Sequence, residues 1–364
     1  MVTAEFSMQV CSGSREEALV LLAAFLPKAG TSYTRNRNFD LGAGQHKHVS
    51  QLSAYIKRRI ITEEDVLKKV LSAHSLNEAG KFIDEIFWRT YFKGWLESRP
   101  HIWMQYCADV HHLTHELQTQ SGLRDRWAAA CLGETGIDCF DAWAKELAET
   151  GYLHNHARMW FASIWVYTLQ LPWQLGADFF LRHLLDGDAA SNTLSWRWVV
   201  GLHSVGKTYL ARAENIQRFT NGRFAPKGLA QVAPPLNDTA STVAPKIIDP
   251  PNPYLEGRKT GLLLHSDDLN IAHLTHRSDC IASAAYRPVD AGTMLVSSPK
   301  LHEFNNAALD AATKRWKSNL LNCCDVTTPE VILSWALENK LEQIITPYAA
   351  VGNTSQMLEK CKRL

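Results

Sequence analysis

The sequence lacks the patterns typical of membrane-spanning, secreted and zinc-binding chains. No run reaches about 18 apolar residues, the length that predicts a membrane-spanning helix. The N-terminal apolar run is short, has no basic start and is flanked by Glu16 and Glu17, which argues against a signal peptide. The eight cysteines include no C-x-x-C pair. We therefore expect a soluble, cytoplasmic protein with reduced thiols.

Charge of one sign is also scarce, because 38 basic and 37 acidic side chains leave a formal net charge of +1. Any binding of nucleic acid must therefore come from a local basic patch rather than from the electrostatic field of the protein's net charge. Two clusters could follow a DNA backbone, although a solvated helix face explains each residue equally well. These clusters are Lys57, Arg58 and Arg59, and later Arg212, Arg218, Arg223 and Lys227.

Proline and tryptophan are unevenly distributed, and this divides the chain. Seven of the fourteen prolines lie between Pro226 and Pro253, in a stretch that cannot hold a regular helix. Ten of the twelve tryptophans lie upstream of it, where apolar residues recur at helical spacing. We predict a helical domain over residues 1–225, a linker over 226–258 and a small α/β domain over 259–364.

Downstream of the linker, short apolar runs alternate with helix-like segments, which is the pattern of an α/β fold. The runs of strand length are GLLLHS at 261–266, TMLVSS at 293–298 and EQIITPYA at 342–349. The helix-like segments are FNNAALDAATKRWKS at 304–318 and TPEVILSWALEN at 328–339.

The segment FIDEIFWRTYFKGW at 82–95 predicts a helix with two apolar faces. Glu85, Trp88 and Phe92 fall opposite the core-facing stripe. Exposed Trp and Phe are uncommon unless another helix or a ligand covers them, so this face indicates either a doubly buried helix or the wall of a pocket for a planar ligand. The expected core-facing stripe is Phe82, Ile83, Ile86 and Phe87.

Two further segments carry polar residues on helical faces. In TGYLHNHARMW at 150–160, Asn155, Arg158 and Met159 share one face. An inward-pointing Arg is costly unless it meets a carboxylate, and Asp186 in DGDAASNTLSWRW at 186–198 can supply one. Farther along that segment, Asn192 and Trp196 are one turn apart and would line the same site.

These segments, in this order and spacing, resemble the flavin domain of the photolyase and cryptochrome superfamily. FIDEIFWRTYF is similar to the family's Glu-x-x-Trp-Arg segment, and SQLSAY at 50–55 is similar to its phosphate-binding Ser-x-Leu-Ser turn. The resemblance covers about residues 33–220. It implies a mainly α fold, in which an all-helical photolyase-like FAD-binding domain is followed here by a small C-terminal α/β segment.

The resemblance implies that FAD is bound non-covalently in the helical domain. The pair of Arg158 and Asp186 would lie against the isoalloxazine ring and Asn192 would face its N5, where the protein tunes the cofactor's electronics. Amides at a helix N-terminus suit the binding of the diphosphate. The residues implied for the diphosphate are Tyr33, Ser50, Leu52 and Ser53, and the further implied cofactor contacts are Arg89, Asn155 and Asp188.

The same resemblance implies a catalytic site for UV-damaged DNA. Glu85, Trp88, Met159 and Trp198 match positions that contact the flipped-out lesion in cyclobutane-dimer photolyases. Trp88 and Trp198 can stack on thymine rings, while Glu85 can hydrogen-bond their edges. Met159, where a histidine is expected in enzymes for the 6-4 photoproduct, favours cyclobutane dimers. We therefore expect a deoxyribodipyrimidine photolyase that repairs DNA in light, and the alternative is a cryptochrome-like blue-light receptor without repair activity.

Tryptophans are also implied in electron transfer. Trp196 and Trp173 match the first two members of the family's relay to the flavin. The third member is missing where the family has it. The outer end could run through Trp127, Trp160 or Trp165, although plain core positions explain each of these more readily.

Other positions depart from the family. His156 stands where many relatives have an arginine that contacts DNA phosphate, so that contact is lost or needs a protonated imidazole. The family's α/β antenna domain does not precede the helical domain. We therefore expect no antenna chromophore, and we expect a monomer.

Two motifs support rival functions more weakly. GLHSVGKT at 201–208 fits the phosphate-loop pattern, but that motif needs a strand before it and a helix opening at Lys207, whereas the preceding stretch is helix-like. Several histidines could pair on a metal, but exposed or capping histidines explain them better, because no carboxylate or cysteine clearly completes a set. These histidines are His111, His112 and His115, and also His46 and His48. We expect no metal site.

Overall fold

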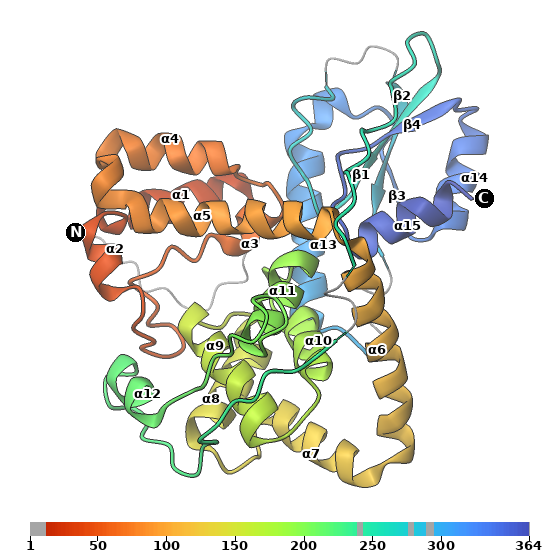
Figure 1. Cartoon of the computed structure of the whole chain (residues 1–364). Helices are drawn as coiled ribbons and strands as arrows, with labels where there is room; N and C mark the ends of the chain where they lie inside the picture. Colours follow the sequence, from red (N-terminus) through yellow and green to blue (C-terminus); the bar gives the residue numbers. More distant parts are fainter. Residues whose placement is uncertain (1–11, 239–242, 276–279, 289–294, 364) are drawn as a thin grey trace.

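The computed structural model describes residues 12–238, 243–275, 280–288 and 295–363 (Figure 1). Helices fill the part upstream of the proline-rich stretch, and a small parallel sheet with helices follows it, which confirms the predicted fold class. The upstream helices are α1 (Arg15–Phe25), α2 (Thr31–Asn36), α3 (Ser53–Lys57), α4 (Glu63–Ala73), α5 (Leu76–Glu97), α6 (Pro100–Thr119), α7 (Ser121–Leu132), α8 (Asp138–Thr150), α9 (Asn155–Ser163), α10 (Trp173–His183), α11 (Ala189–Val199) and α12 (Ala213–Phe219), with a 3₁₀ turn η1 (Leu26–Lys28) and a π-helical turn η2 (Ile164–Thr168).

Local signals fix the helices that carry the candidate site. Ser75 and Glu78 form a reciprocal capping box at the start of α5, which satisfies two backbone N–H groups that the helix leaves unpaired. The carboxylate of Asp188 accepts a hydrogen bond from the Ser191 backbone at 2.8 Å and so caps α11. Pro100 stands at the first position of α6, where its missing N–H costs nothing.

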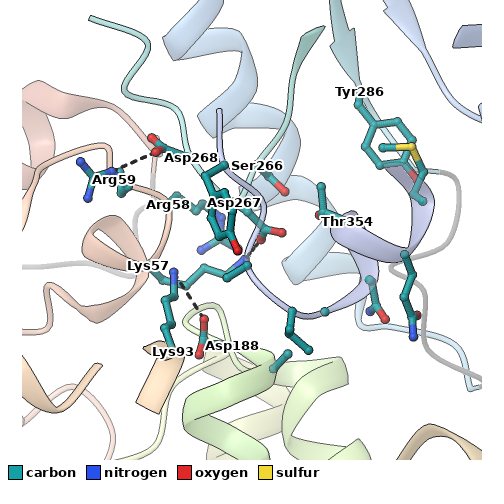
Figure 2. A pocket seen from close by; sticks show the side chains of 18 of the residues that line it. Lys57, Arg58, Arg59, Lys93, Asp188, Ser266, Asp267, Asp268, Tyr286 and Thr354 are labelled. Carbon is teal, nitrogen blue, oxygen red and sulfur yellow. Dashed lines mark hydrogen bonds and ion pairs between the residues drawn. The ribbon is translucent and has the colours of Figure 1, made fainter. Parts of the chain in front are cut away.

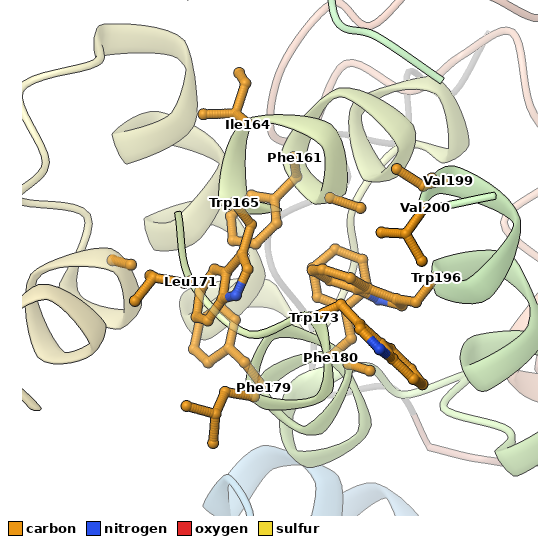
Figure 3. Packing of buried hydrophobic residues seen from close by; sticks show 14 of the residues in the cluster. Phe161, Ile164, Trp165, Leu171, Trp173, Phe179, Phe180, Trp196, Val199 and Val200 are labelled. Carbon is orange, nitrogen blue, oxygen red and sulfur yellow. The ribbon is translucent and has the colours of Figure 1, made fainter. Parts of the chain in front are cut away.

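The core of the helical part is rich in aromatic rings (Figure 3). The rings of Phe140 and Phe161 are stacked with centroids 4.2 Å apart, and Trp165 packs edge-on against Trp196 at 6.2 Å. These side chains are all almost fully buried. Because each buried aromatic removes a large apolar area from water, this cluster is the main source of stability for helices α8 to α11.

The downstream part is a four-stranded sheet in the order β3-β2-β1-β4, with every pair parallel. All five residues of β1 are buried, as expected for a central parallel strand covered on both faces. The elements are β1 (Thr260–Leu264), β2 (Cys280–Tyr286), α13 (Pro299–Arg315), η4 (Lys317–Asn319), β3 (Cys324–Val326), α14 (Pro329–Glu338), β4 (Gln343–Ile345) and α15 (Asn353–Cys361).

One predicted strand is wrong, and two strands, Cys280–Tyr286 and Cys324–Val326, were missed. In the predicted run TMLVSS, residues 295–298 form no strand, and Ser298 instead caps α13 by accepting a hydrogen bond from the Leu301 backbone; residues 293 and 294 lie outside the described part of the chain. The second strand is Cys280–Tyr286. Its alanines and serine carry little β-propensity, so only tertiary packing identifies it.

The two parts of the chain share a hydrophobic cluster. Phe304, Ala308 and Leu309 of α13 pack with Phe25 and other side chains of the N-terminal helices. Among the described residues between 220 and 259 there is no helix or strand, in keeping with a linker, while the boundaries at 225 and 258 stay a proposal. None of the described helices is long and apolar enough to cross a membrane.

Candidate functional site

The predicted pair of Arg158 and Asp186 is formed. Nη2 of Arg158, on α9, lies 3.0 Å from Oδ2 of Asp186, which follows α10. Burial alone would raise the pKa of Asp186, but the positive charges of Arg158 and Arg89 and a hydrogen bond from Ser53 hold that pKa below its usual value. Asp186 is therefore ionised, and four residues of the predicted cofactor set meet around one buried carboxylate.

Two atoms of this cluster have unused hydrogen-bonding capacity. Oδ1 of Asp186 and Nη1 of Arg89 are buried, and neither has a hydrogen-bond partner within the residues that the structure describes. A buried polar atom without a partner costs free energy, so a ligand that offers both a donor and an acceptor would be stabilised here. A flavin ring edge offers both kinds of group, since a ring N–H can donate to Asp186 and a carbonyl can accept from Arg89, while a diphosphate offers acceptors; the residues present therefore fit FAD.

Three of the four residues predicted for the diphosphate, Ser50, Leu52 and Ser53, lie at the start of α3. Oγ of Ser50 accepts a hydrogen bond from the Leu52 backbone at 3.4 Å, and Ser53 is the first residue of α3. Leu52 is fully buried. Tyr33, on α2, is also buried, and its ring contacts Phe82 of α5 at 5.2 Å between centroids.

The remaining predicted cofactor residues differ in their contacts and in their burial. Nδ2 of Asn192 donates a hydrogen bond to the backbone oxygen of Ala177 at 2.8 Å, which leaves Oδ1 as the atom that can face a ligand. Asp188 caps α11 and lies 3.7 Å from the ammonium of Lys93. Asn155 is the first residue of α9 and is exposed.

Helix α5 carries two of the four predicted lesion-contacting residues, Glu85 and Trp88, whereas Met159 is on α9 and Trp198 is on α11. Trp88 is 49% exposed, although a tryptophan in a stable core would be buried. Its ring contacts Tyr91 at 5.3 Å and Phe92 at 5.8 Å between centroids. Glu85, one turn earlier, forms an ion pair with Arg37.

The predicted core-facing stripe of α5 is wrong in one position. Phe82, Ile83 and Ile86 are buried, but Phe87 is 53% exposed. Phe87 lies beyond the edge of the buried stripe, because a helix turns by about 100° for each residue. The exposed apolar surface of α5 is therefore wider than the sequence pattern indicated.

The structure adds two aromatic contacts that the sequence did not predict, one made by His203 and one by Tyr209. The His203 ring packs against Trp95 at 4.7 Å and against Phe92 at 5.8 Å. Trp198 stacks on Tyr209 at 5.6 Å. The spacing of His203 gave no signal for this contact, since it lies more than 100 residues from α5 in the sequence.

Three basic residues considered for DNA binding are engaged with the α/β part of the chain instead. Nζ of Lys57 lies 2.6 Å from a carboxylate oxygen of Asp267, which follows β1 (Figure 2). Nε of Arg58 donates to Asn305 of α13 at 2.9 Å, and Arg58 is almost fully buried. Arg59 lies 3.0 Å from Asp268. These side chains join the helical part to the α/β part, and the interpretation that they follow a DNA backbone is wrong.

A cavity of about 860 Å³ lies at this junction. Ser266 and Asp267, which follow β1, line it together with Lys57 and Asp188. Trp103 also lines it. The carboxyl ends of parallel strands are a common place for ligands in α/β folds. The expectation that no antenna chromophore is present stays a prediction.

His156 is not available as a phosphate ligand in its present state. Its ring stacks on Trp160 with centroids 4.0 Å apart, and Nδ1 lies 3.0 Å from the backbone oxygen of Asn38. Burial lowers the pKa of His156 below its usual value. The imidazole is therefore uncharged at neutral pH, and the arginine contact of the relatives is not replaced by a cation.

The rival motifs do not form the predicted structures. The phosphate-loop pattern at 201–208 follows helix α11 instead of a strand, and the next helix begins only at Ala213. Lys207 is exposed. The reading of His46 as exposed or capping is wrong, because it is buried and its Nε2 lies 2.6 Å from Glu146. With Asp40 these two side chains form a compact buried cluster, in which Asp40 accepts a hydrogen bond from Nε1 of Trp143 at 2.9 Å.

The fold and this residue set define a helical domain that combines the Arg158–Asp186 ion pair with exposed aromatic side chains on α5. Residues 82–228 match a family model described as the FAD binding domain of DNA photolyase. These residues therefore belong to the flavin-binding domain family of photolyases and cryptochromes.

Two curated relatives carry the same family name. The chain is 29% identical over 189 residues to the deoxyribodipyrimidine photo-lyase of Alkalihalophilus pseudofirmus, a match that covers 51% of this chain and 38% of the relative. It is 31% identical over 198 residues to that of Thermus thermophilus, covering 51% and 42% respectively. The matched region thus spans less than half the length of these relatives.

The chain was also matched by solved structures, one of which is from a bacterium. A bacterial class III photolyase from Agrobacterium tumefaciens is 24% identical and covers 57% of this chain and 43% of its own, with a TM-score of 0.46.

Proposed function

We propose that the chain binds FAD and repairs cyclobutane pyrimidine dimers in DNA with light. The observation that carries the proposal is the arrangement on α5, where one helix presents Glu85 and the half-exposed Trp88 outward and Arg89 toward the buried Asp186. A lesion-stacking surface and a cofactor pocket thus lie on neighbouring faces of one helix. Reduced FAD, when bound and illuminated, would supply one electron to the dimer.

The chain's own residues would hold the cofactor in place. Arg158 and Asp186 form a buried, preformed ion pair whose spare Oδ1 can accept a hydrogen bond from a ring N–H. The amide oxygen of Asn192 would face the ring from α11. The residues that we propose for the remaining contacts are Tyr33, Ser50, Leu52, Ser53, Arg89, Asn155 and Asp188.

The lesion would be held by stacking and by one carboxylate. Trp88 and Trp198 offer flat indole faces to the thymine rings of an extruded dimer, and stacking on an aromatic residue contributes about 1–3 kcal/mol per base. Glu85 can hydrogen-bond a base edge once it exchanges its partner Arg37. Met159 supplies a flexible apolar contact. Exposed Arg218 and other basic residues near α12 could contact the phosphate backbone.

A repair assay with matched variants tests the proposal. Purified, FAD-loaded and chemically reduced protein is illuminated with blue light in the presence of an oligonucleotide that contains one thymine dimer, and the remaining dimer is measured by chromatography. Trp88→Ala should weaken binding of the damaged strand and slow repair at low DNA concentration. Phe87→Ala is the control, because it truncates an exposed ring that lies one residue earlier and about 100° around α5 from Trp88.

The outcome also separates repair from signalling. No loss of dimers by the reduced, FAD-loaded wild-type protein would contradict the proposal and would leave a blue-light receptor with the same domain as the better account. Equal losses in Trp88→Ala and Phe87→Ala would contradict the assignment of Trp88.

A further inference from the structure

A row of aromatic rings runs outward from Trp173. The Tyr106 ring is stacked on Trp173 with centroids 5.7 Å apart and planes 30° apart. Trp103, one turn earlier on α6, contacts Tyr106 at 5.2 Å. Both α6 rings are only 3% exposed. The three rings are therefore in contact, within the aromatic core.

The inner end of the row reaches Trp196. Trp196 packs on α10 at Gly176, where a Cβ would come within 2.3 Å of the indole ring. Trp173 lies one turn before Gly176 on the same helix, and Figure 3 shows Trp173 and Trp196 within one cluster. The outer end differs, because Trp103 lines the cavity of about 860 Å³ at the junction with the α/β part. The row thus connects the buried core to this cavity.

The phenol of Tyr106 and the indole of Trp103 differ in how they behave when they lose an electron. An oxidised phenol loses its proton readily, but the Tyr106 hydroxyl is buried and has no hydrogen-bond partner among the described residues. Burial also raises the pKa of Tyr106 well above its usual value. Tyr106 therefore has no group to which it can pass a proton, and it suits a bridge between indoles. An indole such as Trp103 can carry the positive charge without losing a proton.

Trp165 offers a competing route that ends in the core. Its ring contacts Trp196 at 6.2 Å, but Trp165 is fully buried. Its other ring contacts are Phe140, Phe161 and Phe179, and a phenyl ring is much harder to oxidise than an indole. The positive charge on an oxidised Trp165 would therefore not move outward through these neighbouring phenyl rings.

We propose that Trp103 is the outer electron donor of the relay, which reduces Trp173 and Trp196 again after they are oxidised. Tyr106 bridges Trp103 and Trp173. The inference rests on the proposed function, because it assumes that Trp196 gives an electron to photoexcited, oxidised FAD. One electron then passes from Trp103 through Tyr106 to Trp173 and on to Trp196. A small thiolate in the cavity returns one electron to Trp103 and becomes a thiyl radical. No bond forms or breaks in the protein.

Flash-induced radicals in the FAD-loaded, oxidised protein test the proposal. Wild-type protein should show a long-lived tryptophan radical by transient absorption and electron paramagnetic resonance, and its decay should quicken as dithiothreitol is added. Trp103→Phe and Tyr106→Leu should lose the long-lived radical. Trp127→Phe and Trp165→Phe should retain it. Retention in Trp103→Phe, or loss in Trp127→Phe or Trp165→Phe, would overturn the inference.

Two further measurements keep the result interpretable. In wild-type protein that contains ring-deuterated tryptophan, the electron paramagnetic resonance spectrum of the radical should become narrower. If it becomes narrower only with ring-deuterated tyrosine, the proposal is wrong, and no variant is needed to show this. Repair by chemically reduced wild-type protein tests the proposed function separately. If that protein repairs dimers while Trp103→Phe keeps the radical, only the relay is wrong. If it does not repair them while the radical depends on Trp103, the repair function is wrong and the relay stands.

Discussion

The ammonium group of Lys57 lies 2.6 Å from the carboxylate of Asp267, although the two residues are 210 positions apart in the sequence. Burial alone would raise the pKa of Asp267, but the charge of Lys57 and nearby hydrogen-bond donors hold that pKa well below its usual range. The pair joins α3 to the carboxyl end of β1 and contributes one wall of the cavity.

Removing one partner of this pair should destabilise the protein. Lys57→Met leaves Asp267 charged and largely shielded from water, and the free energy of unfolding should fall by about 3 kcal/mol. The double variant Lys57→Met/Asp267→Leu should recover much of the loss, because no unpaired charge remains. Urea denaturation measures both changes. The control is Lys68→Met, whose exposed pair with Glu64 should contribute little; equal losses in the two single variants would contradict the prediction.

Flavin binding should depend on the pair of Arg158 and Asp186. Arg158→Ala leaves the buried Asp186 carboxylate without its main partner, so the pocket loses both shape and charge balance. The ratio of flavin to protein absorbance after purification should fall sharply, and added FAD should not restore it. Arg218→Ala on the exposed face of α12 should purify with a normal ratio. A full complement of flavin in Arg158→Ala would refute the assignment.

Acid should destabilise the fold through His154. Burial lowers the pKa of His154 to about 4 from 6.5. Below pH 6.5 the unfolded chain therefore binds a proton that the folded chain does not, and stability is lost as the pH falls from 6.5 toward 4, by on the order of 2 kcal/mol. Urea midpoints across this range should fall less steeply for His154→Gln than for the exposed-site control His112→Gln. Parallel slopes would contradict the prediction.

Gly176 should be needed for the packing of Trp196. In Gly176→Ala the new methyl group would come within 2.3 Å of the Trp196 ring, whose other side is confined by the core. Such overpacking costs about 1–3 kcal/mol. The control is Gly80→Ala on α5, where nothing lies within 4 Å of a Cβ and alanine should stabilise the helix by about 0.5–1 kcal/mol. Thermal unfolding should show shifts of opposite sign, and a stable Gly176→Ala would contradict the packing.

The sequence predicted those site features that depend on helical periodicity. Arg158 and Asp186 were paired because an inward-pointing arginine needs a carboxylate, and the structure places them 3.0 Å apart. The face of α5 that carries Glu85 and Trp88 was predicted from spacing alone. The face of α5 follows from helical spacing, and the ion pair follows from the cost of an unpaired buried charge.

Features that depend on distant contacts could not be predicted. Lys57 and Arg58 have the same composition as a DNA-binding patch, and only their partners in the α/β part reveal another role. Strand Cys280–Tyr286 consists mainly of small residues, so its sequence lacks the β-branched signal of a strand. The contact between Tyr106 and Trp173 joins two helices, and no spacing rule places those rings together.

Light-driven splitting of a single dimer tests the central claim most directly. An oligonucleotide with one thymine dimer is mixed with FAD-loaded protein under anaerobic conditions, with the flavin either oxidised or chemically reduced, and each sample is kept dark or exposed to blue light. The proposal predicts loss of the dimer and recovery of two intact thymines only in the reduced, illuminated sample. An unchanged dimer in that sample, with FAD bound and reduced, would contradict repair as the function of this protein.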